Sequence, residues 1–327
     1  MKKDLFIEYY KKRQFDIEKT NQAIAEVEKL ETYLHSLGST LETATPADIQ
    51  KYISLLMKNQ LNHPETLLAL ARYFLITDRK EIYIYFTSIF GGCGVIENIR
   101  TRLEVEHGKT VADEIFQEVE ILSLGTPLSE MPHFTNQFMK TLEEKLPIGA
   151  CQKSLAGNNH EISKEGFLSE KEYYEKAPSL DAYLLDRHHR MVAVLQEHCD
   201  ENKVWFEQII TQDVVNFVEA NPEMLSAVRQ GDYLYITKIP YDTVHLLKTN
   251  DENQKKYFLC HCPFVRESLL TNRVHISPNW CYCSGGFAKV MFEVLFDTEL
   301  DIEVLETPLK GDSRCRFRIP IPPTVKK

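Results

Sequence analysis

Apolar residues recur at intervals of three and four through the first 150 residues, which is the pattern of amphipathic helices. After the apolar positions of residues 20–37 comes Gly38, a residue that favours a left-handed helix cap. Residues 45–48 read Thr-Pro-Ala-Asp, an N-cap followed by a helix-starting proline, and Pro64 repeats the proline start. The pattern predicts helices over residues 20–37, 45–56, 63–74, 78–90, 95–107, 110–122 and 131–146.

The second half of the chain mixes helical spacing with alternation. Helical spacing predicts helices over residues 180–198, from Thr211 to 218, and over 287–295 with Ser284 as cap. Residues 151–178, rich in Gly, Asn, Ser and Lys, are predicted to wrap the surface as a loop segment. Alternation predicts strands at residues 204–210, 233–239, 256–262, 300–305 and 315–319. These elements predict a mostly antiparallel sheet covered by helices, and an α+β fold class.

The 327 residues divide into three predicted regions. Residues 1–90 form an all-α bundle, 91–150 a helical connector, and 151–327 a cysteine-rich α+β domain. With 43% hydrophobic residues the chain has enough apolar material for a sizeable core. A homodimer is compatible with this composition.

Charges interrupt the N-terminal segment, and no run of about 18 to 20 uncharged residues occurs, so we expect a cytoplasmic protein without a membrane partner. Thiols stay reduced in that compartment, which favours metal ligands, reactive groups or core filler over disulfides for the eight cysteines. The net charge of -10 argues against a polyanion as the natural partner of the whole protein.

Five of the eight cysteines lie between residues 260 and 315. They form Cys-His-Cys-Pro from 260, Cys-Tyr-Cys-Ser-Gly-Gly from 281, and the single Cys315. On an extended segment a Cys-x-Cys pair places both thiols on one face, and converging thiolates select zinc, copper(I) or iron–sulfur clusters. The alternative is that these are reduced, buried cysteines that pack as small hydrophobes. The predicted metal ligands are Cys260, Cys262, Cys281, Cys283, Cys315 and Glu306, with His261 and His275 as further donors, for zinc or alternatively an iron–sulfur cluster.

The same residues allow thiol catalysis. Cys262 and Cys283 are the candidate nucleophiles, and His261 or His275 is the candidate base. Arg266 would supply a cation that lowers the pKa of the thiol.

The N-terminal order of elements resembles the core-binding, SAM-like domain of tyrosine recombinases and phage integrases. The likeness rests on the helix ending at Gly38, the Thr45-Pro46 start and the helix that ends Arg72-Tyr73-Phe74. It implies DNA or partner binding by residues 1–90; the alternative is a helical bundle that mediates contacts or dimerisation. The DNA-binding candidates are Lys12, Arg13, Lys51, Lys58 and Arg72.

Recombinase catalysis is not expected. In that family a His-x-x-Arg motif is part of the active site, whereas here Arg187 stands where the leading histidine should be, in Arg187-His188-His189-Arg190. The rest of the family's catalytic pattern is also missing from the sequence.

The C-terminal order of Cys283-Ser284-Gly285-Gly286, a helix, Glu306, Gly311-Asp312 and Cys315 resembles the 4-vinyl reductase domain. It is also similar to an uncharacterised cysteine-rich bacterial family and, more distantly, to the thiazoline-carboxylate hydrolase group. The resemblance implies a small-molecule-binding fold with a zinc ion on Glu306, Cys315 and either Cys281 or Cys283. Leu309 stands near the place of a further cysteine ligand, for which Cys260 and Cys262 are substitutes.

These observations favour a cytoplasmic binding or sensor protein. A thiolate metal site would organise a small-molecule pocket in the C-terminal domain, and the N-terminal module would bind DNA or a partner. One alternative is a thiol-dependent hydrolase or reductase. The other is a DNA-binding protein of integrase-like origin.

Overall fold

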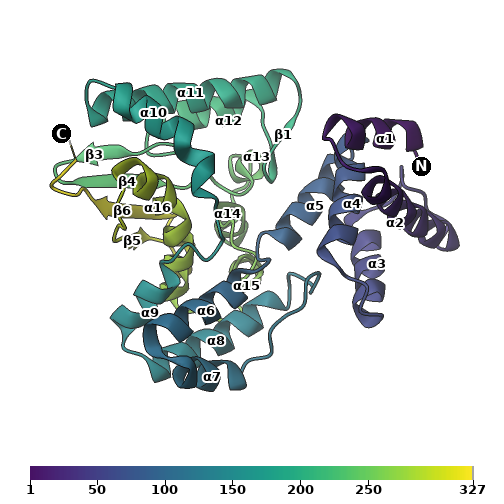
Figure 1. Cartoon of the computed structure of the whole chain (residues 1–327), viewed down its shortest axis with the longest axis horizontal. Helices are drawn as coiled ribbons and strands as arrows, with labels where there is room; N and C mark the ends of the chain where they lie inside the picture. Colours follow the sequence, from purple (N-terminus) through teal and green to yellow (C-terminus); the bar gives the residue numbers. More distant parts are fainter. Residues whose placement is uncertain (326–327) are drawn as a thin grey trace. The chain divides into compact units, whose positions relative to one another are not determined.

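The computed structural model describes residues 1–325 and has the expected α+β fold (Figure 1). The chain divides into two compact units. Unit 1 comprises Met1–Gly91 and Leu122–Leu128, and unit 2 comprises Gly92–Ile121 and the described residues from Ser129 onward. The last two residues of the predicted region 151–327 lie outside the described part of the chain.

Unit 1 is helical, as the apolar spacing predicts. The predicted proline starts are confirmed, because α3 begins at Pro46 and α4 at Pro64. Thr45 and Asp48 form a capping box: the Thr45 hydroxyl accepts from the Asp48 N–H at 3.3 Å, and the Asp48 carboxylate accepts from the Thr45 N–H at 3.1 Å. The helices are α1 (Lys3–Lys12), α2 (Ile17–Ser36), α3 (Pro46–Lys58), α4 (Pro64–Ile76) and α5 (Lys80–Phe90).

Unit 2 holds a four-stranded antiparallel sheet in the order β3-β4-β6-β5. Its strands are β3 (Val228–Gln230), β4 (Tyr233–Thr237), β5 (Glu303–Glu306) and β6 (Arg316–Pro320). Helix α16 (Tyr282–Phe296) lies against the sheet (Figure 1), and its residues Phe292 and Leu295 share one buried core with the sheet residues Leu234 and Phe317. The antiparallel pairing of β4 with β6 brings Thr237 opposite Arg316, so the residues that follow β4 and precede β6 are neighbours.

The other elements of unit 2 are mainly helical. A short hairpin joins β1 (Val204–Trp205) to β2 (Gln208–Ile209). The helices before the hairpin are α6 (Val95–His107), α7 (Lys109–Gln117), α8 (Met131–Lys145), α9 (Ile148–Leu155), η1 (Lys164–Phe167), α10 (Leu168–Lys176) and α11 (Leu180–Asp200). Those after it are α12 (Gln212–Glu219), α13 (Thr243–Leu246), α14 (Glu252–Leu259), α15 (Arg266–Thr271), η2 (Pro278–Cys281) and η3 (Pro308–Lys310).

Four local predictions are wrong. Ser284, expected to cap the last helix, lies inside α16, which begins at Tyr282. The strand expected at residues 256–262 is helix α14, because Asp251 caps a helix there by accepting from the Gln254 N–H at 2.8 Å. The segment 151–178 contains helices α9 and α10 instead of a continuous loop. The strand expected at 204–210 is split by a turn, in which Phe206 has a φ of 48°.

One stretch of the described residues, Lys80–His107, is long and apolar enough to cross a membrane by length and composition. Those two properties are weak evidence, because the core helix of a globular protein has them as well. Within this stretch Ile82, Phe86 and Ile89 are buried in the core of unit 1, and Gly94 has a φ of 74°.

Candidate functional site

The five cysteines between residues 260 and 315 come together in one buried neighbourhood of unit 2. Burial raises the pKa of the Cys260 thiol most strongly, and the adjacent Cys315, Cys262 and Cys281 raise it further. Burial and then Cys262 raise the pKa of Cys283. Segments distant in sequence supply these thiols: the residues after α14, the start of α16, and the residue before β6. The sequence motifs therefore form one cluster, which we call the thiol cluster.

Gly286 explains how α16 comes so close to another part of unit 2, whereas the neighbouring Gly285 is less tightly packed. A Cβ on Gly286 would lie 2.2 Å from the carbonyl oxygen of Gly157, closer than real atoms approach. A Cβ on Gly285 would lie 3.3 Å from a side-chain methyl of Ile302. Only a residue without a side chain at position 286 allows the first turn of α16 to touch the 156–157 backbone.

The contact of α16 with the backbone of residues 156–157 places the nearby His160 beside the thiol cluster. The Cys283 Sγ lies 3.6 Å from His160 Nε2, within hydrogen-bonding distance for sulfur. Burial, and then the charge of Lys238, lowers the pKa of His160 to about 4, so the imidazole is neutral at pH 7. A neutral imidazole can accept the proton of a neighbouring thiol, but burial disfavours both charged products of the transfer, the Cys283 thiolate and the His160 imidazolium, so catalysis would need a bound substrate to offset this cost.

The positive charge of Lys238 acts on several residues of the thiol cluster. Lys238 directly follows β4, and its backbone N–H donates to the Cys315 carbonyl at 3.0 Å. Its Nζ donates to the Ser284 hydroxyl at 3.1 Å and lies 4.9 Å from the ring centroid of Phe287. Among the residues that the structure describes, no carboxylate lies within ion-pair distance of this half-buried ammonium group. Its charge therefore acts on the thiols and histidines around it, including Cys283 and His160.

The remaining thiols are held by separate partners. Trp280 Nε1 donates to Cys262 Sγ at 3.2 Å, and Cys281 Sγ lies 2.9 Å from the buried Thr307 hydroxyl. Within residues 1–325 no three Cys, His, Asp or Glu side chains are arranged so that they could hold one metal ion. The thiols are thus near one another, but they do not form a preassembled metal cage.

Glu306, the predicted carboxylate ligand, is paired with arginines. Its carboxylate accepts from Arg314 at 2.9 and 2.8 Å, and Arg316 lies 3.7 Å away. The hydrogen bond from Arg314 is the main reason why the pKa of Glu306 is lowered. The two arginines would therefore compete with a metal ion for the Glu306 carboxylate.

His261 and His275, the histidines predicted as bases, have other surroundings than His160. His261 Nε2 donates to the Ile239 carbonyl at 2.7 Å, and burial lowers the pKa of His261 to about 3. His275 is exposed and lines a surface cavity. Arg266, the predicted cation, is fully buried and lies 3.6 Å from the ring centroid of Tyr241. His160 is the histidine that sequence reasoning missed, because it lies 123 residues from its partner.

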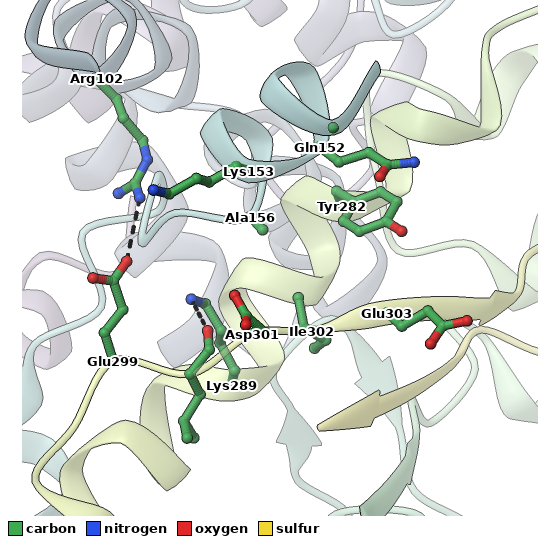
Figure 2. Close-up of a pocket in the computed structure, with 12 residues that line it drawn as sticks. Arg102, Gln152, Lys153, Ala156, Tyr282, Lys289, Glu299, Asp301, Ile302 and Glu303 are labelled. Atoms are coloured by element: carbon green, nitrogen blue, oxygen red, sulfur yellow. Dashed lines mark hydrogen bonds and ion pairs between the residues drawn. The ribbon is translucent and has the colours of Figure 1, made fainter. Parts of the chain in front are cut away.

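A cavity of about 390 Å³ lies beside the start of α16 and is lined by Tyr282 (Figure 2). Figure 2 shows the Lys153 ammonium group pointing toward the Arg102 guanidinium group. Carboxylates compensate much of the positive charge: Arg102 lies 3.6 Å from Glu299, and the buried Lys289 lies 2.8 Å from Glu293. The cavity therefore has no strong preference for one sign of ligand charge.

In unit 1, three of the five predicted DNA-binding residues already have interaction partners within the protein. Lys12 pairs with Glu8 at 2.7 Å, and Lys51 lies 3.8 Å from Asp48. The Arg72 guanidinium group lies 4.8 Å from the Phe15 ring centroid and donates to the Tyr10 hydroxyl at 3.3 Å.

The two other candidates differ from these. Arg13 lies 4.8 Å from the ring centroid of Tyr9, and Lys58 is exposed. DNA binding by unit 1 stays a prediction, without a concentrated basic face among the five residues to support it.

Comparison with known proteins gives one match. Residues 235–325 are similar to a family described as "Family of unknown function (DUF6144)". No curated protein matches the chain. No solved structure matches it either. The matched segment contains Lys238, Ser284, Phe287 and the thiol cluster, whereas His160 lies outside it.

Proposed function

We propose that unit 2 is a thiol-dependent hydrolase in which Cys283 is the nucleophile and His160 is the general base. The contact of 3.6 Å between Cys283 Sγ and His160 Nε2 carries this proposal. Geometry is the first requirement for a base, which must reach the proton that it removes. His160 meets this requirement in the folded chain, and His261 donates to a backbone carbonyl instead.

The proposed reaction proceeds through a thioester. Sγ of Cys283 attacks the electrophilic carbon of an acyl substrate, and the proton of the Cys283 thiol passes to His160 Nε2. His160 then gives this proton to the leaving group, which departs and leaves a thioester on Cys283. Water, activated by the same imidazole, then attacks the thioester. The acid is released, and the proton returns to the Cys283 thiol.

Lys238 supports this chemistry electrostatically. An ammonium group without a carboxylate partner stabilises the negative charge that develops on the substrate oxygen during attack. The hydrogen bond of 3.1 Å to Ser284 fixes the ammonium group one residue from the nucleophile along α16. Phe287 covers His160 and Lys238 and is 41% exposed, so a substrate would approach beside its ring.

Peptide mapping after iodoacetamide treatment tests the proposal. The exposed Cys93 should first be replaced by serine, because it would react in any case. We expect one equivalent of label, on Cys283, in the native protein. Label on Cys262 with Cys283 unmodified would contradict the choice of nucleophile.

A soft-metal centre is the second candidate function, and the convergence of Cys260, Cys262, Cys281 and Cys315 favours it. Four thiolates around a divalent ion carry excess negative charge, which Lys238 and Arg266 would offset. Binding would require the thiols to lose their protons and move around one ion, whereas the hydrogen bonds from Trp280 to Cys262 and between Thr307 and Cys281 could be kept, because a metal-bound thiolate still accepts hydrogen bonds. The binding or sensor function predicted from the sequence depends on this candidate.

Elemental analysis of anaerobically purified protein separates the two functions. One equivalent of zinc or iron that is lost from a Cys260→Ser and Cys315→Ser double variant would support the metal centre. Metal-free protein with a reactive Cys283 would support the hydrolase.

A further inference from the structure

A second cavity of unit 2, of about 360 Å³, has a lining of distinctive composition. It lies between helices α14 and α15 and the turn at η3, and Lys256 and Lys310 both line it. No aspartate or glutamate is among its lining residues. We call this space the lysine cavity.

Both ammonium groups are available to a ligand. In the described part of the chain neither Lys256 nor Lys310 has an ion pair with a carboxylate. The neighbouring acids along the chain are occupied: Glu252 pairs with Lys255 at 2.8 Å, and Asp312 accepts from the Thr307 N–H at 2.8 Å. The cavity therefore concentrates positive charge in a protein whose net charge is -10.

The rest of the lining is mixed: Ser268 and Asn272 add polar groups, and a smaller part is apolar. Leu269 and Ile276 are buried at its wall, and Leu309 and Pro308 come from the turn at η3. His275 adds a polar group at the edge, where its backbone carbonyl accepts from Asn136. Cavities that bind small molecules commonly combine an apolar lining with a few convergent polar groups, and a volume of a few hundred Å³ is typical.

We infer that the lysine cavity binds a small organic anion, with its carboxylate or sulfonate group between Lys256 and Lys310 and its apolar body against Leu269, Ile276 and Leu309. The first cavity differs, because carboxylates line it together with its cations. The inference does not depend on catalysis at Cys283, so either proposal can fail while the other holds.

Fluorescence titration with 8-anilinonaphthalene-1-sulfonate tests the inference, because this probe joins an aromatic body to one sulfonate. N-phenyl-1-naphthylamine, which has the same aromatic body without the charge, is the matched probe. We expect saturable binding of the sulfonate at one site, weakened by added salt because ion pairing contributes. The uncharged probe should bind at least about tenfold more weakly, because it cannot form the charged hydrogen bonds to the lysines.

A double variant, Lys256→Gln with Lys310→Gln, removes both charges at the cavity. Its affinity for the sulfonate should fall by about tenfold or more. The control is Lys164→Gln with Lys248→Gln, which makes the same change of charge at exposed lysines that line neither cavity. Equal affinities in the two double variants, or equal affinities of the two probes for the unaltered protein, would overturn the inference.

Discussion

Cys283 and His160 are 123 residues apart along the chain, yet the thiol sulfur lies 3.6 Å from the imidazole Nε2. The contact depends on how α16 docks against the 156–160 segment. A glycine without a side chain at the docking point, Gly286, permits that approach. The double glycine after the Cys-x-Cys motif thus has a geometric role in assembling the candidate site.

Replacing Gly286 by alanine should destabilise unit 2. The added methyl would meet the backbone of Gly157 and Ala156, which cannot move aside as a side chain can. We expect a loss of roughly 1–3 kcal/mol in the free energy of unfolding, measured by urea denaturation.

Gly285→Ala is the matched control. The methyl there would approach the flexible tip of Ile302 at 3.3 Å, so the loss should be clearly smaller. Equal losses from the two substitutions would show that close backbone docking does not explain the glycine pair.

Glu170 should stabilise the packing of α10 on α11 in a manner that depends on pH. Burial tends to raise its pKa, but Arg190, Arg187 and Tyr183 outweigh burial and hold the pKa at about 2, below the ordinary glutamate value of 4.5. The stabilisation is complete above pH 4.5 and is lost as the pH falls toward about 2. Glu170→Gln should therefore cost ~2–3 kcal/mol at neutral pH and less at about pH 3.

Urea denaturation at the two pH values measures this effect. Glu172→Gln on the same helix is the control, because Glu172 is exposed and lies 3.4 Å from Lys176. Its cost should be within about 0.5 kcal/mol of zero at both pH values. A cost for Glu170→Gln that did not change with pH would contradict the assignment of a charged, arginine-held carboxylate.

The arrangement of basic residues in unit 1 predicts little DNA binding. A gel-shift titration of the full chain at about 50 and about 200 mM salt tests this, because phosphate contacts make affinity fall steeply with salt. We expect no shifted band at the lower salt concentration. A band that disappears at higher salt and is weakened by Arg13→Gln with Lys58→Gln would support the predicted DNA binding by residues 1–90.

Local signals in the sequence were sufficient for much of the fold. The Thr45-Pro46 start and the proline start at Pro64 place two helices correctly, since a cap is determined by a few adjacent residues. Asp251 before α14 is the same kind of signal, but the alternation over residues 256–262 favours a strand, and that prediction is wrong.

The candidate site was only partly predictable. The motifs indicate the cysteines that converge, but Cys262 and Cys281 find hydrogen-bond partners in Trp280 and Thr307, which spacing along the chain does not reveal. His160 belongs to a polar segment with no motif of its own. Its role depends on tertiary docking, and no pattern local to residues 156–160 could have indicated it.

The rate at which iodoacetamide alkylates Cys283 tests the central claim most directly, measured by peptide mass spectrometry in a Cys93→Ser background at neutral pH. His160→Gln should slow the alkylation of Cys283 by about a hundredfold, the lower range for loss of a positioned base. The control His189→Gln, which alters an exposed histidine, should leave the rate unchanged. A Cys283 that is never alkylated in the folded protein, or that reacts equally fast without His160, would contradict the account.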